Sequence, residues 1–209
     1  MNQIQIVNPV VNDLTELINI NTYYFAKIEQ TNKALNIPDE FYRNYAEFIT
    51  EKALNFNQIL VAKQDDKIIG FLIWEDYCKP LVEGIKGNPE VYKLIAPEIS
   101  FVELLEKKLN EIHKFKIGEC AKLMQVAVLP GFQNRGIASK LASSAIDIIK
   151  ECEYKFIIAD CTADNSWQLL IKFGFEILTE IPYSDFDYDG KNVFSEIKGK
   201  RRLVIKHLQ

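Results

Sequence analysis

The sequence contains few of the residues that form metal sites or disulfide frameworks. Its 209 residues include four cysteines and two histidines. These residues do not have the paired spacing of a zinc site, so the sequence predicts no metal site. Buried structural thiols are the simpler interpretation of the cysteines, and a Cys–His nucleophile pair is the alternative. The residues concerned are Cys78, Cys120, Cys152, Cys161, His113 and His207.

Long apolar runs and an excess of basic residues are also missing. The longest apolar run, near Ile68–Trp74, is far too short to span a membrane. Residues Met1–Val10 lack the basic and apolar regions of a secretory signal. The net charge of -4 and the pI near 5.4 disfavour a general nucleic-acid binder and favour cationic small ligands. We therefore expect a cytoplasmic protein with reduced thiols and with neither a membrane nor a nucleic acid as partner.

No repeat, low-complexity linker or change of composition divides the chain. Its 48% apolar and 26% charged residues are typical of a globular protein, and its length suffices for one full-sized core. Residues 1–209 are therefore expected to form a single domain. We interpret the basic tail Lys198–Lys206 first as a solvated edge strand, because lysine on an edge discourages aggregation. Steering of an anionic cofactor is the alternative.

The most informative segment is Met124–Ala138, which reads MQVAVLPGFQNRGIA. An apolar run ends at Pro130–Gly131, a polar loop follows, and Ser139–Lys150 then has helical periodicity. This pattern predicts a strand, a turn and a helix N-terminus, whose free N–H groups and dipole suit an anion such as a pyrophosphate. The segment is not a P-loop, because Ile137 stands where the lysine must be, and it is not GxGxxG. A simple strand-to-helix connection is the alternative.

The remaining pattern predicts further strands and helices. The expected strands are Ile4–Val10, Gln58–Lys63, Lys67–Tyr77, Ala121–Leu129, Lys155–Asp160, Phe175–Tyr183 and Val193–Leu208. The expected helices begin near Asn12 or Asp13 and cover Tyr23–Leu35, Pro38–Leu54, Gly136–Glu151 and Asp164–Lys172. The long segment Lys79–Glu119 contains a helical stripe of Val102, Leu105, Leu109 and Ile112, and Gly174 suits a left-handed helix cap.

The loop resembles motif A of the GCN5-related N-acetyltransferases, Q/R-x-x-G-x-G/A, and the order of elements resembles that family's β-α-α-β-β-β-α-β-α-β-β topology. The resemblance implies an α/β (α+β) fold with a twisted, mixed but mostly antiparallel sheet of about seven strands flanked by helices. It also implies acetyl-CoA as co-substrate, with its pyrophosphate on the loop and its pantetheine arm along the preceding strand. The cofactor-binding residues so implied are Val126, Ala127, Val128, Gln133, Asn134, Arg135, Gly136, Ile137, Ala138 and Ser139.

Other segments resemble the arylalkylamine N-acetyltransferase-like branch of that family, notably the insect dopamine acetyltransferases. Residues 174–194 are similar to that branch's tail, and residues 25–31 lie where it has F-x-x-x-E-P-L and its catalytic glutamate, here Glu29. Leu170 replaces the tyrosine that usually protonates the leaving thiolate. If Thr162 begins a helix, Thr162 and Ser166 share one helical face with Leu170. The resemblance covers nearly the whole chain except Lys79–Glu119, a family-variable segment.

The resemblance implies an acetyl-CoA-dependent N-acetyltransferase that acts on a small primary amine such as an arylalkylamine. Glu29 would be the general base, and Ser166 with Thr162 behind it would protonate the thiolate. A polyamine, aminoglycoside or peptide N-terminus is the alternative acceptor, and a non-catalytic acyl-CoA-binding module is the alternative class. From the residues alone, the simpler interpretations are a solvated helix residue for Glu29, an N-cap for Thr162 and a small residue beside the cofactor for Ser166. The sequence does not distinguish a monomer from a homodimer.

Overall fold

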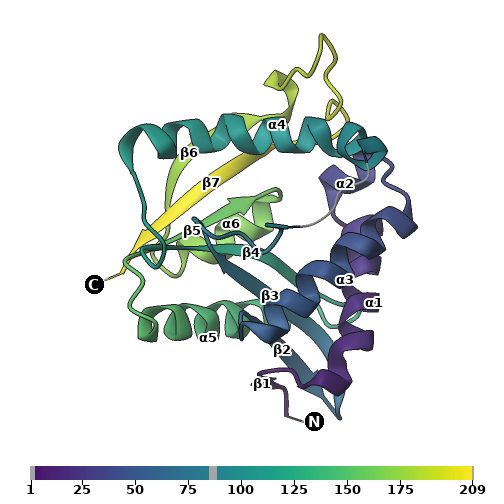
Figure 1. Ribbon diagram of the computed structural model, residues 1–209, viewed down its shortest axis with the longest axis vertical. Helices are drawn as coiled ribbons and strands as arrows, with labels where there is room; N and C mark the ends of the chain where they lie inside the picture. Colours follow the sequence, from purple (N-terminus) through teal and green to yellow (C-terminus); the bar gives the residue numbers. More distant parts are fainter. Residues whose placement is uncertain (1–2, 85–88, 209) are drawn as a thin grey trace.

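The computed structural model describes residues 3–84 and 89–208, which form six α-helices around a seven-stranded sheet (Figure 1). The strand order is β1-β2-β3-β4-β5-β7-β6, and every neighbouring pair is antiparallel except β4 with β5. The strands are β1 (Gln5–Val7), β2 (Ile59–Gln64), β3 (Lys67–Asp76), β4 (Cys120–Val128), β5 (Phe156–Cys161), β6 (Glu176–Pro182) and β7 (Lys200–His207). The helices are α1 (Leu14–Lys27), α2 (Gln30–Ala34), α3 (Asp39–Asn55), α4 (Pro89–Ile112), α5 (Ile137–Glu151) and α6 (Asp164–Ile171).

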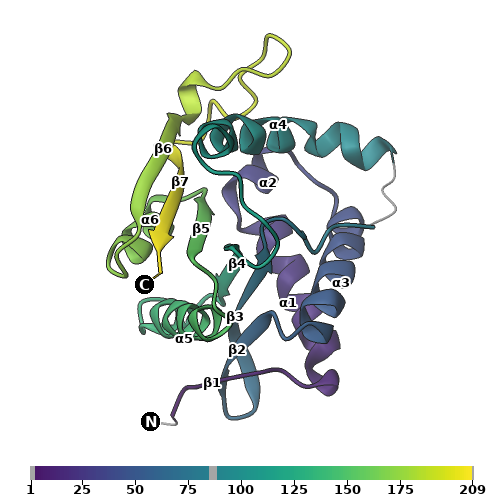
Figure 2. The same ribbon diagram turned by 60° about the vertical axis from the view of Figure 1, so that its left-hand side comes forward.

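Helices cover both faces of this sheet, because alternate strand residues point to opposite faces and most of them are apolar. On one face, α5 and α6 pack in a cluster that includes Leu60 and Ile157. On the other face, α1 and α3 cover β2 and β3 through residues such as Ile59, whereas α4 covers β5 and β7 through Ile158. Figure 2 shows α1 and α3 apart from α5, with α4 running across one end of the sheet.

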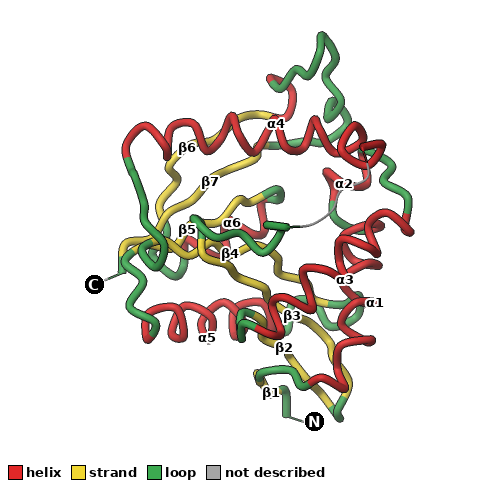
Figure 3. The backbone as a smooth tube through the Cα atoms, in the orientation of Figure 1, coloured by secondary structure: helices red, strands yellow, loops and turns green. Residues whose placement is uncertain are grey.

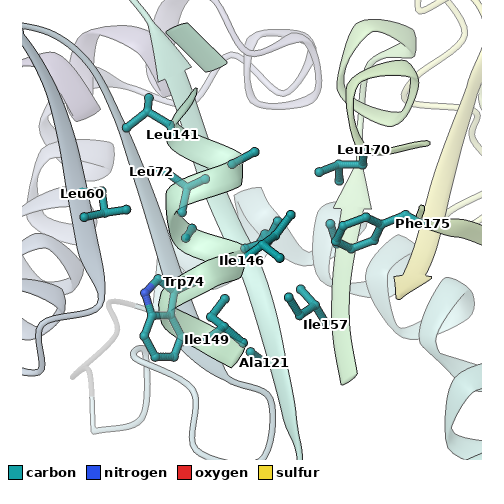
Figure 4. Packing of buried hydrophobic residues seen from close by; sticks show 14 of the residues in the cluster. Leu60, Leu72, Trp74, Ala121, Leu141, Ile146, Ile149, Ile157, Leu170 and Phe175 are labelled. Atoms are coloured by element: carbon teal, nitrogen blue, oxygen red, sulfur yellow. The ribbon is translucent and has the colours of Figure 1, made fainter. Parts of the chain in front are cut away.

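Helix α5, which follows the predicted loop, packs against the sheet through one buried face. Leu141, Ala145 and Ile149 recur every four residues and are fully buried. Leu141 and Ile149 lie in one cluster with Trp74 of β3 and Ile157 of β5 (Figure 4). Burying one large aliphatic side chain stabilises the fold by about 1.5–3 kcal/mol. The packing of this stripe therefore fixes where α5 begins and where the loop before it lies.

The predicted sheet of about seven strands, mixed but mostly antiparallel and flanked by helices, is confirmed, and most differences concern the ends of elements. The first strand is shorter than predicted, because a short 3-10 helix follows it at Val11–Asp13. The predicted helix Tyr23–Leu35 is wrong: α1 continues to Lys27, and only Gln30–Ala34 forms a second helix. Glu29, between them, has extended backbone (φ -61°, ψ 128°), which no α-helix tolerates.

The last strand is also misplaced by the prediction. The strand expected at Val193–Leu208 begins only at Lys200, and residues 183–199 form a 3-10 helix and a long loop (Figure 3). The tail is not a solvated edge, because β7 lies between β5 and β6, and Arg201 and Arg202 are 2% and 9% exposed. Their charges can lie inside because Asp160 and Glu180 pair with them.

The segment Lys79–Glu119 is dominated by α4, which has Pro97 in its interior. The predicted stripe is largely confirmed, since Leu105 and Leu109 are fully buried, although Ile112 is exposed. Searched over residues 3–84 and 89–208, the chain has no helix both long and apolar enough to cross a membrane.

Candidate active site

The two central parallel strands separate along the sheet. Only four residue pairs join β4 to β5, from Cys120 with Phe156 to Leu123 with Ala159. Beyond Leu123, β4 continues to Val128 beside β3 alone. The register between β3 and β4 shifts so that Met124 is an extra residue in β4, and such a bulge bends the strand that carries it. One edge of Met124–Val128 therefore faces a gap rather than a strand.

Register shows which backbone groups face that gap. The Leu129 N–H donates to the Ile69 carbonyl oxygen at 2.9 Å, so residue 129 directs its N–H toward β3. Direction alternates along an antiparallel pair, which turns Ala127 toward β3 as well, whereas Val126 and Val128 turn their N–H and carbonyl groups toward the gap. Of the three strand residues expected to bind the cofactor, Val126 and Val128 thus offer free backbone groups and Ala127 does not.

The loop after β4 is shaped by residues with positive φ. Gly131 (φ 86°), Asn134 (φ 62°) and Gly136 (φ 74°) all lie in the left-handed region, which favours glycine and tolerates asparagine. Gly136 is the N-cap of α5, no side chain caps the helix there, and a Cβ built on Gly136 would meet no atom within 4 Å. The N-terminal N–H groups of α5 therefore face open space, as an anion site requires.

The side chains of the loop are less available than its backbone. Arg135 donates from Nη2 to the Gly131 carbonyl oxygen at 2.8 Å and lies 5.1 Å from the centre of the Phe132 ring. Ile137 is buried in the core at 2% exposed, so only its backbone can serve a ligand. Gln133, Asn134 and Gly136 are exposed, and Ala138 and Ser139 are half-buried.

A cavity of about 890 Å³ lies where the strands separate. Met124, Gln125 and Val126 of β4 line it, and so do Thr162 and Ser166 beyond the end of β5. Ala142 of α5, on the opposite face of the sheet, also lines it, so the cavity extends through the gap. Most of its remaining walls come from α1, α2, α3 and α4, and β3 and β7 contribute Glu75 and Arg201. Apolar and aromatic lining residues include Tyr24, Phe25, Ile28, Phe41, Tyr42, Tyr45, Ile95 and Leu169.

The charged lining residues are mostly acidic. Two cationic side chains face five carboxylates, and both cations are engaged in ion pairs, Lys122 with Glu106 at 2.7 Å and Arg201 with Asp160 at 2.5 Å. Burial raises the pKa values of the tyrosines Tyr42 and Tyr45, which keeps both hydroxyls neutral. The five lining carboxylates are Glu29, Glu75, Glu98, Glu103 and Asp160.

Glu29 lies in this cavity but not on a helix face. It is the N-cap of α2, and its carboxylate accepts hydrogen bonds from the Thr31 N–H (3.2 Å), the Thr31 hydroxyl (2.8 Å) and the Asn32 N–H (2.8 Å). These three donors hold the carboxylate at the helix N-terminus, where the dipole favours negative charge. The neighbouring Gln30 donates to the Thr162 carbonyl oxygen and so ties α2 to the end of β5.

Thr162 and Ser166 both line the cavity, but they do not share a helical face. Thr162 precedes α6, whose N-cap is Ala163, so the expectation that Thr162 begins the helix or caps it is wrong. The Thr162 carbonyl oxygen, rather than its hydroxyl, has defined partners, namely Gln30 and the Tyr183 hydroxyl at 2.7 Å. Ser166 lies in the first turn of α6, with its N–H donating to the Ala163 carbonyl oxygen at 3.1 Å.

Two polar groups of the site are absent from the sequence-based prediction. One is a buried network in which Asn21 donates to Gln125 at 3.0 Å and Gln125 donates to the Tyr42 hydroxyl at 2.9 Å, linking α1 and α3 to the bulged part of β4. The other is the ion cluster of Glu98, Asp160 and Arg201. Their members are separated by up to 104 positions in the sequence, so no local spacing could have revealed them.

No metal site was found among the described residues, searched for groups of three or more His, Cys, Asp or Glu side chains. The four cysteines are free, and Cys120 and Cys161 are buried. Burial raises the pKa of both buried thiols, which makes them poor nucleophiles.

Comparison with known proteins agrees with this geometry. The sequence profile of the Acetyltransferase (GNAT) family matches residues 22–175, and the chain belongs to that family. It is therefore an acyltransferase by family and fold. None of the curated proteins compared with the chain matches it.

Solved structures resemble the chain over its whole length. The C-terminal condensation domain of Ebony, in complex with beta-alanyl-dopamine, is 15% identical with a TM-score of 0.84, and the match covers all of both chains. Arylalkylamine N-acetyltransferase 2 from Aedes aegypti is 19% identical with a TM-score of 0.74, again covering all of both chains. The Drosophila melanogaster polyamine N-acetyltransferase is 18% identical with a TM-score of 0.72, covering 99% of this chain and 100% of that one. Identities this low show a common fold.

Proposed function

We propose that the protein is an acetyl-CoA-dependent N-acetyltransferase that transfers an acetyl group to a small primary amine. One arrangement carries the proposal: the free edge of β4 connects a glycine loop at a helix N-terminus with an acidic, largely apolar cavity. A pyrophosphate fits the loop, and an extended amide-containing arm fits the free edge. A protonated amine fits the cavity.

The residues present suit acetyl-CoA on each count. Residues 134–139 offer backbone N–H groups at the start of α5, and Gly136 leaves that space open. Val126 and Val128 offer the hydrogen bonds of a missing strand. Acetyl-CoA supplies a thioester, whose carbonyl carbon bonds to the amine nitrogen as the carbon–sulfur bond breaks.

The chain's own groups then handle the protons and the charge. Glu29 takes the proton that the ammonium must lose before its nitrogen can attack, directly or through a water molecule. A backbone N–H at the gap, from Val126 or Val128, donates to the carbonyl oxygen as negative charge develops there. Ser166 donates to the departing sulfur in place of the tyrosine that Leu170 replaces.

The acceptor we propose is an arylalkylamine, because the cavity combines aromatic walls with carboxylates. Tyr24, Phe25 and Tyr42 surround the space beside Glu29, and the neighbouring structures include an arylalkylamine N-acetyltransferase. A ring buried among them would gain about 2–3 kcal/mol. We also propose that the enzyme is cytoplasmic and that it needs no metal ion. Activity in the presence of a chelator would test the second point.

Release of the CoA thiol from acetyl-CoA, measured with a panel of amines, tests the proposal. We expect acetylation of at least one small primary amine and no acetylation without an amine. Binding of CoA by calorimetry without transfer to any amine would identify an acyl-CoA-binding module instead. Failure to bind CoA would overturn the whole proposal.

A further inference from the structure

The segment between β6 and β7, residues 183–199, has no role in the chemistry proposed above. Its first residue, Tyr183, begins a short 3-10 helix, is fully buried, and does not line the cavity. Phe186 and Phe194 of the same segment are also buried, and both rings pack with that of Phe101 in α4. Tyr183 therefore cannot touch an acceptor held in the cavity, and any part it has in the reaction must pass through a neighbouring residue.

The surrounding fold fixes the position of the Tyr183 hydroxyl. The Tyr183 ring meets those of Phe101 and Phe194 edge-on, with ring centres 5.5 and 6.0 Å apart. The backbone is held as well, because the Tyr183 N–H donates to the Gly199 carbonyl oxygen at 3.2 Å and Asn192 donates to the Tyr183 carbonyl oxygen at 3.1 Å. A ring enclosed in this way has little freedom to shift, so its hydroxyl can hold other groups in place.

This hydroxyl joins the end of β5 to the start of α2. It donates to the Thr162 carbonyl oxygen at 2.7 Å, and Gln30 donates to that same oxygen. Gln30 Nε2 also lies 3.4 Å from the Tyr183 hydroxyl oxygen, which closes a triangle of three hydrogen bonds. A carbonyl oxygen has two lone pairs and accepts from both donors at once. Burial raises the pKa of Tyr183, so the hydroxyl stays protonated and keeps donating.

The triangle lies next to Glu29 in the chain. Glu29 immediately precedes Gln30, and its carboxylate is bound by N–H groups of α2, so it moves with that helix. Five residues are too few for a helix that is stable alone, so α2 depends on its contacts. Ala34 and Leu35, at its far end, pack against the apolar cluster that contains Tyr183. Loss of the triangle would therefore loosen the end of α2 that carries the carboxylate.

We infer that Tyr183 is a positioning residue, whose hydroxyl holds α2 against the end of β5 and so holds Glu29 in place for proton transfer. This inference rests on the proposed function, in which Glu29 is the general base. A base must lie within hydrogen-bond reach of its proton, and a misplacement of about 1 Å can lower the rate by about 100-fold. The segment 183–199 thus acts on the reaction from outside the cavity, through α2.

Removing the hydroxyl alone tests this role. Tyr183→Phe should lower turnover by about tenfold, with the affinity for CoA unchanged in calorimetry. Tyr154→Phe is the matched control, because the Tyr154 hydroxyl also donates a hydrogen bond, to Asp76 at 3.1 Å, and neither residue lines the cavity. Each variant loses a hydrogen bond and should melt about 2–4 °C lower, but Tyr154→Phe should keep wild-type turnover. Equal losses of turnover in both variants would show that Tyr183 serves only the fold.

A double-mutant cycle shows whether the effect passes through Glu29. An amide takes no proton wherever it lies, so in a Glu29→Gln background Tyr183→Phe should change the remaining turnover by less than about twofold. In a Ser166→Ala background the loss caused by Tyr183→Phe should persist in full. A tenfold loss in the Glu29→Gln background would overturn the inference, because a general defect of the fold acts equally in every background.

The other side of the triangle gives a second variant, which decides the question if Tyr183→Phe does not fold. Gln30→Met keeps the length of the side chain and removes its N–H donors. It should lower turnover about as much as Tyr183→Phe, with the same dependence on Glu29. Wild-type turnover in Gln30→Met, or a loss that persists in the Glu29→Gln background, would overturn the inference.

Failure of the proposed function would be recognised separately. If the protein acetylates no amine, or if Glu29→Gln is fully active, the proposed function or its base is wrong, and amide hydrogen exchange still decides whether Tyr183 holds α2. Exchange at Gln30–Ala34 should be about fivefold faster or more in Tyr183→Phe than in the wild type, and unchanged in Tyr154→Phe. Unchanged exchange in Tyr183→Phe would overturn the inference.

Discussion

The two sides of the site present different chemical groups to their ligands, backbone groups on one side and side chains on the other. The donor side, comprising β4 from Met124 to Val128 and the loop to Ser139, presents mainly backbone groups from one continuous segment. The acceptor side, the cavity, presents side chains from all six helices and from β3, β4, β5 and β7. Backbone geometry at a glycine loop is a local property, whereas a side-chain cavity depends on packing over the whole fold. We therefore expect substitutions to act differently on the two sides, through affinity for CoA on one and through turnover and acceptor choice on the other.

The largest effect should come from Glu29 on the acceptor side. Glu29→Gln should lower turnover by about 10²- to 10⁴-fold, because the amide cannot take a proton, and it should alter the acidic limb of the pH–rate profile. Affinity for CoA, measured by calorimetry, should stay near that of the wild type.

A second variant at the same position separates catalysis from helix capping. Aspartate is an excellent N-cap, so Glu29→Asp should keep α2 but withdraw the carboxylate from the cavity. If Glu29 only caps the helix, Glu29→Asp would be as active as the wild type, and the acceptor side would lose its proposed base.

Acceptor choice should show the next largest effect. An arylalkylamine should exceed a ring-free monoamine of similar length by about 30- to 150-fold in kcat/KM. This factor corresponds to the free energy of burying a ring, if all of that free energy stabilises the transition state. Both amines carry a single charge, so the comparison measures the contribution of the ring. A preference for a peptide N-terminus would reject the acceptor assignment and leave the donor side untouched.

On the donor side, Gly136→Val should weaken CoA binding by about 10- to 100-fold. A β-branched residue is strained at φ 74°, and its side chain would enter the space at the start of α5. Arg135→Ala should weaken CoA binding less, because the Arg135 guanidinium donates a hydrogen bond to the Gly131 carbonyl oxygen instead of facing open space. Calorimetry with CoA gives both values, and a larger loss in Arg135→Ala would contradict a backbone-built anion site.

Removing the Ser166 hydroxyl should have an effect of similar or smaller size, on turnover rather than on affinity for CoA. Ser166→Ala should lower turnover by about tenfold or somewhat more through the loss of a hydrogen bond to a charged sulfur, with CoA affinity unchanged. Thr162→Val is the control, because the defined contacts of Thr162 use its carbonyl oxygen. Equal effects of the two substitutions would show that the hydroxyl of Ser166 has no special role.

The smallest expected effect is the stabilisation of the folded protein by CoA. CoA at about 100 times its dissociation constant stabilises the folded state by about 2.7 kcal/mol. For a chain of this size, that raises the melting temperature by roughly 5–10 °C in a thermal unfolding scan. Gly136→Val should lose this shift and Glu29→Gln should keep it, which would confirm the division between the two sides.

The same division explains what the sequence could predict. β4, the loop and α5 follow from residues adjacent in the chain, namely an apolar run, Pro130–Gly131 and a stripe with helical spacing, so their positions were correctly predicted. The direction of individual backbone groups was not, because the bulge at Met124 depends on pairing with β3. Ala127 therefore could not be distinguished from Val126 and Val128.

Errors on the acceptor side have a different physical cause. Glu29 was placed within a helix because its neighbours favour helix, yet its side chain caps the following turn, a contact that periodicity does not encode. The basic tail was interpreted as an edge strand because lysine on an edge discourages aggregation. Arg201 lies inside because Asp160 and Glu98, 41 and 103 residues away in the sequence, meet it there.

The separation of β4 from β5 has a consequence for amide hydrogen exchange. Across that gap the sheet consists of two ladders joined by four residue pairs, so the amides of Val126 and Val128 lack the protection that a neighbouring strand gives. A ligand lying along the gap would complete the ladder, slowing exchange at these two amides while leaving Ala127 unchanged. Slower exchange at Val126 and Val128 but not at Ala127 would thus indicate that the cofactor binds as an eighth strand of the sheet.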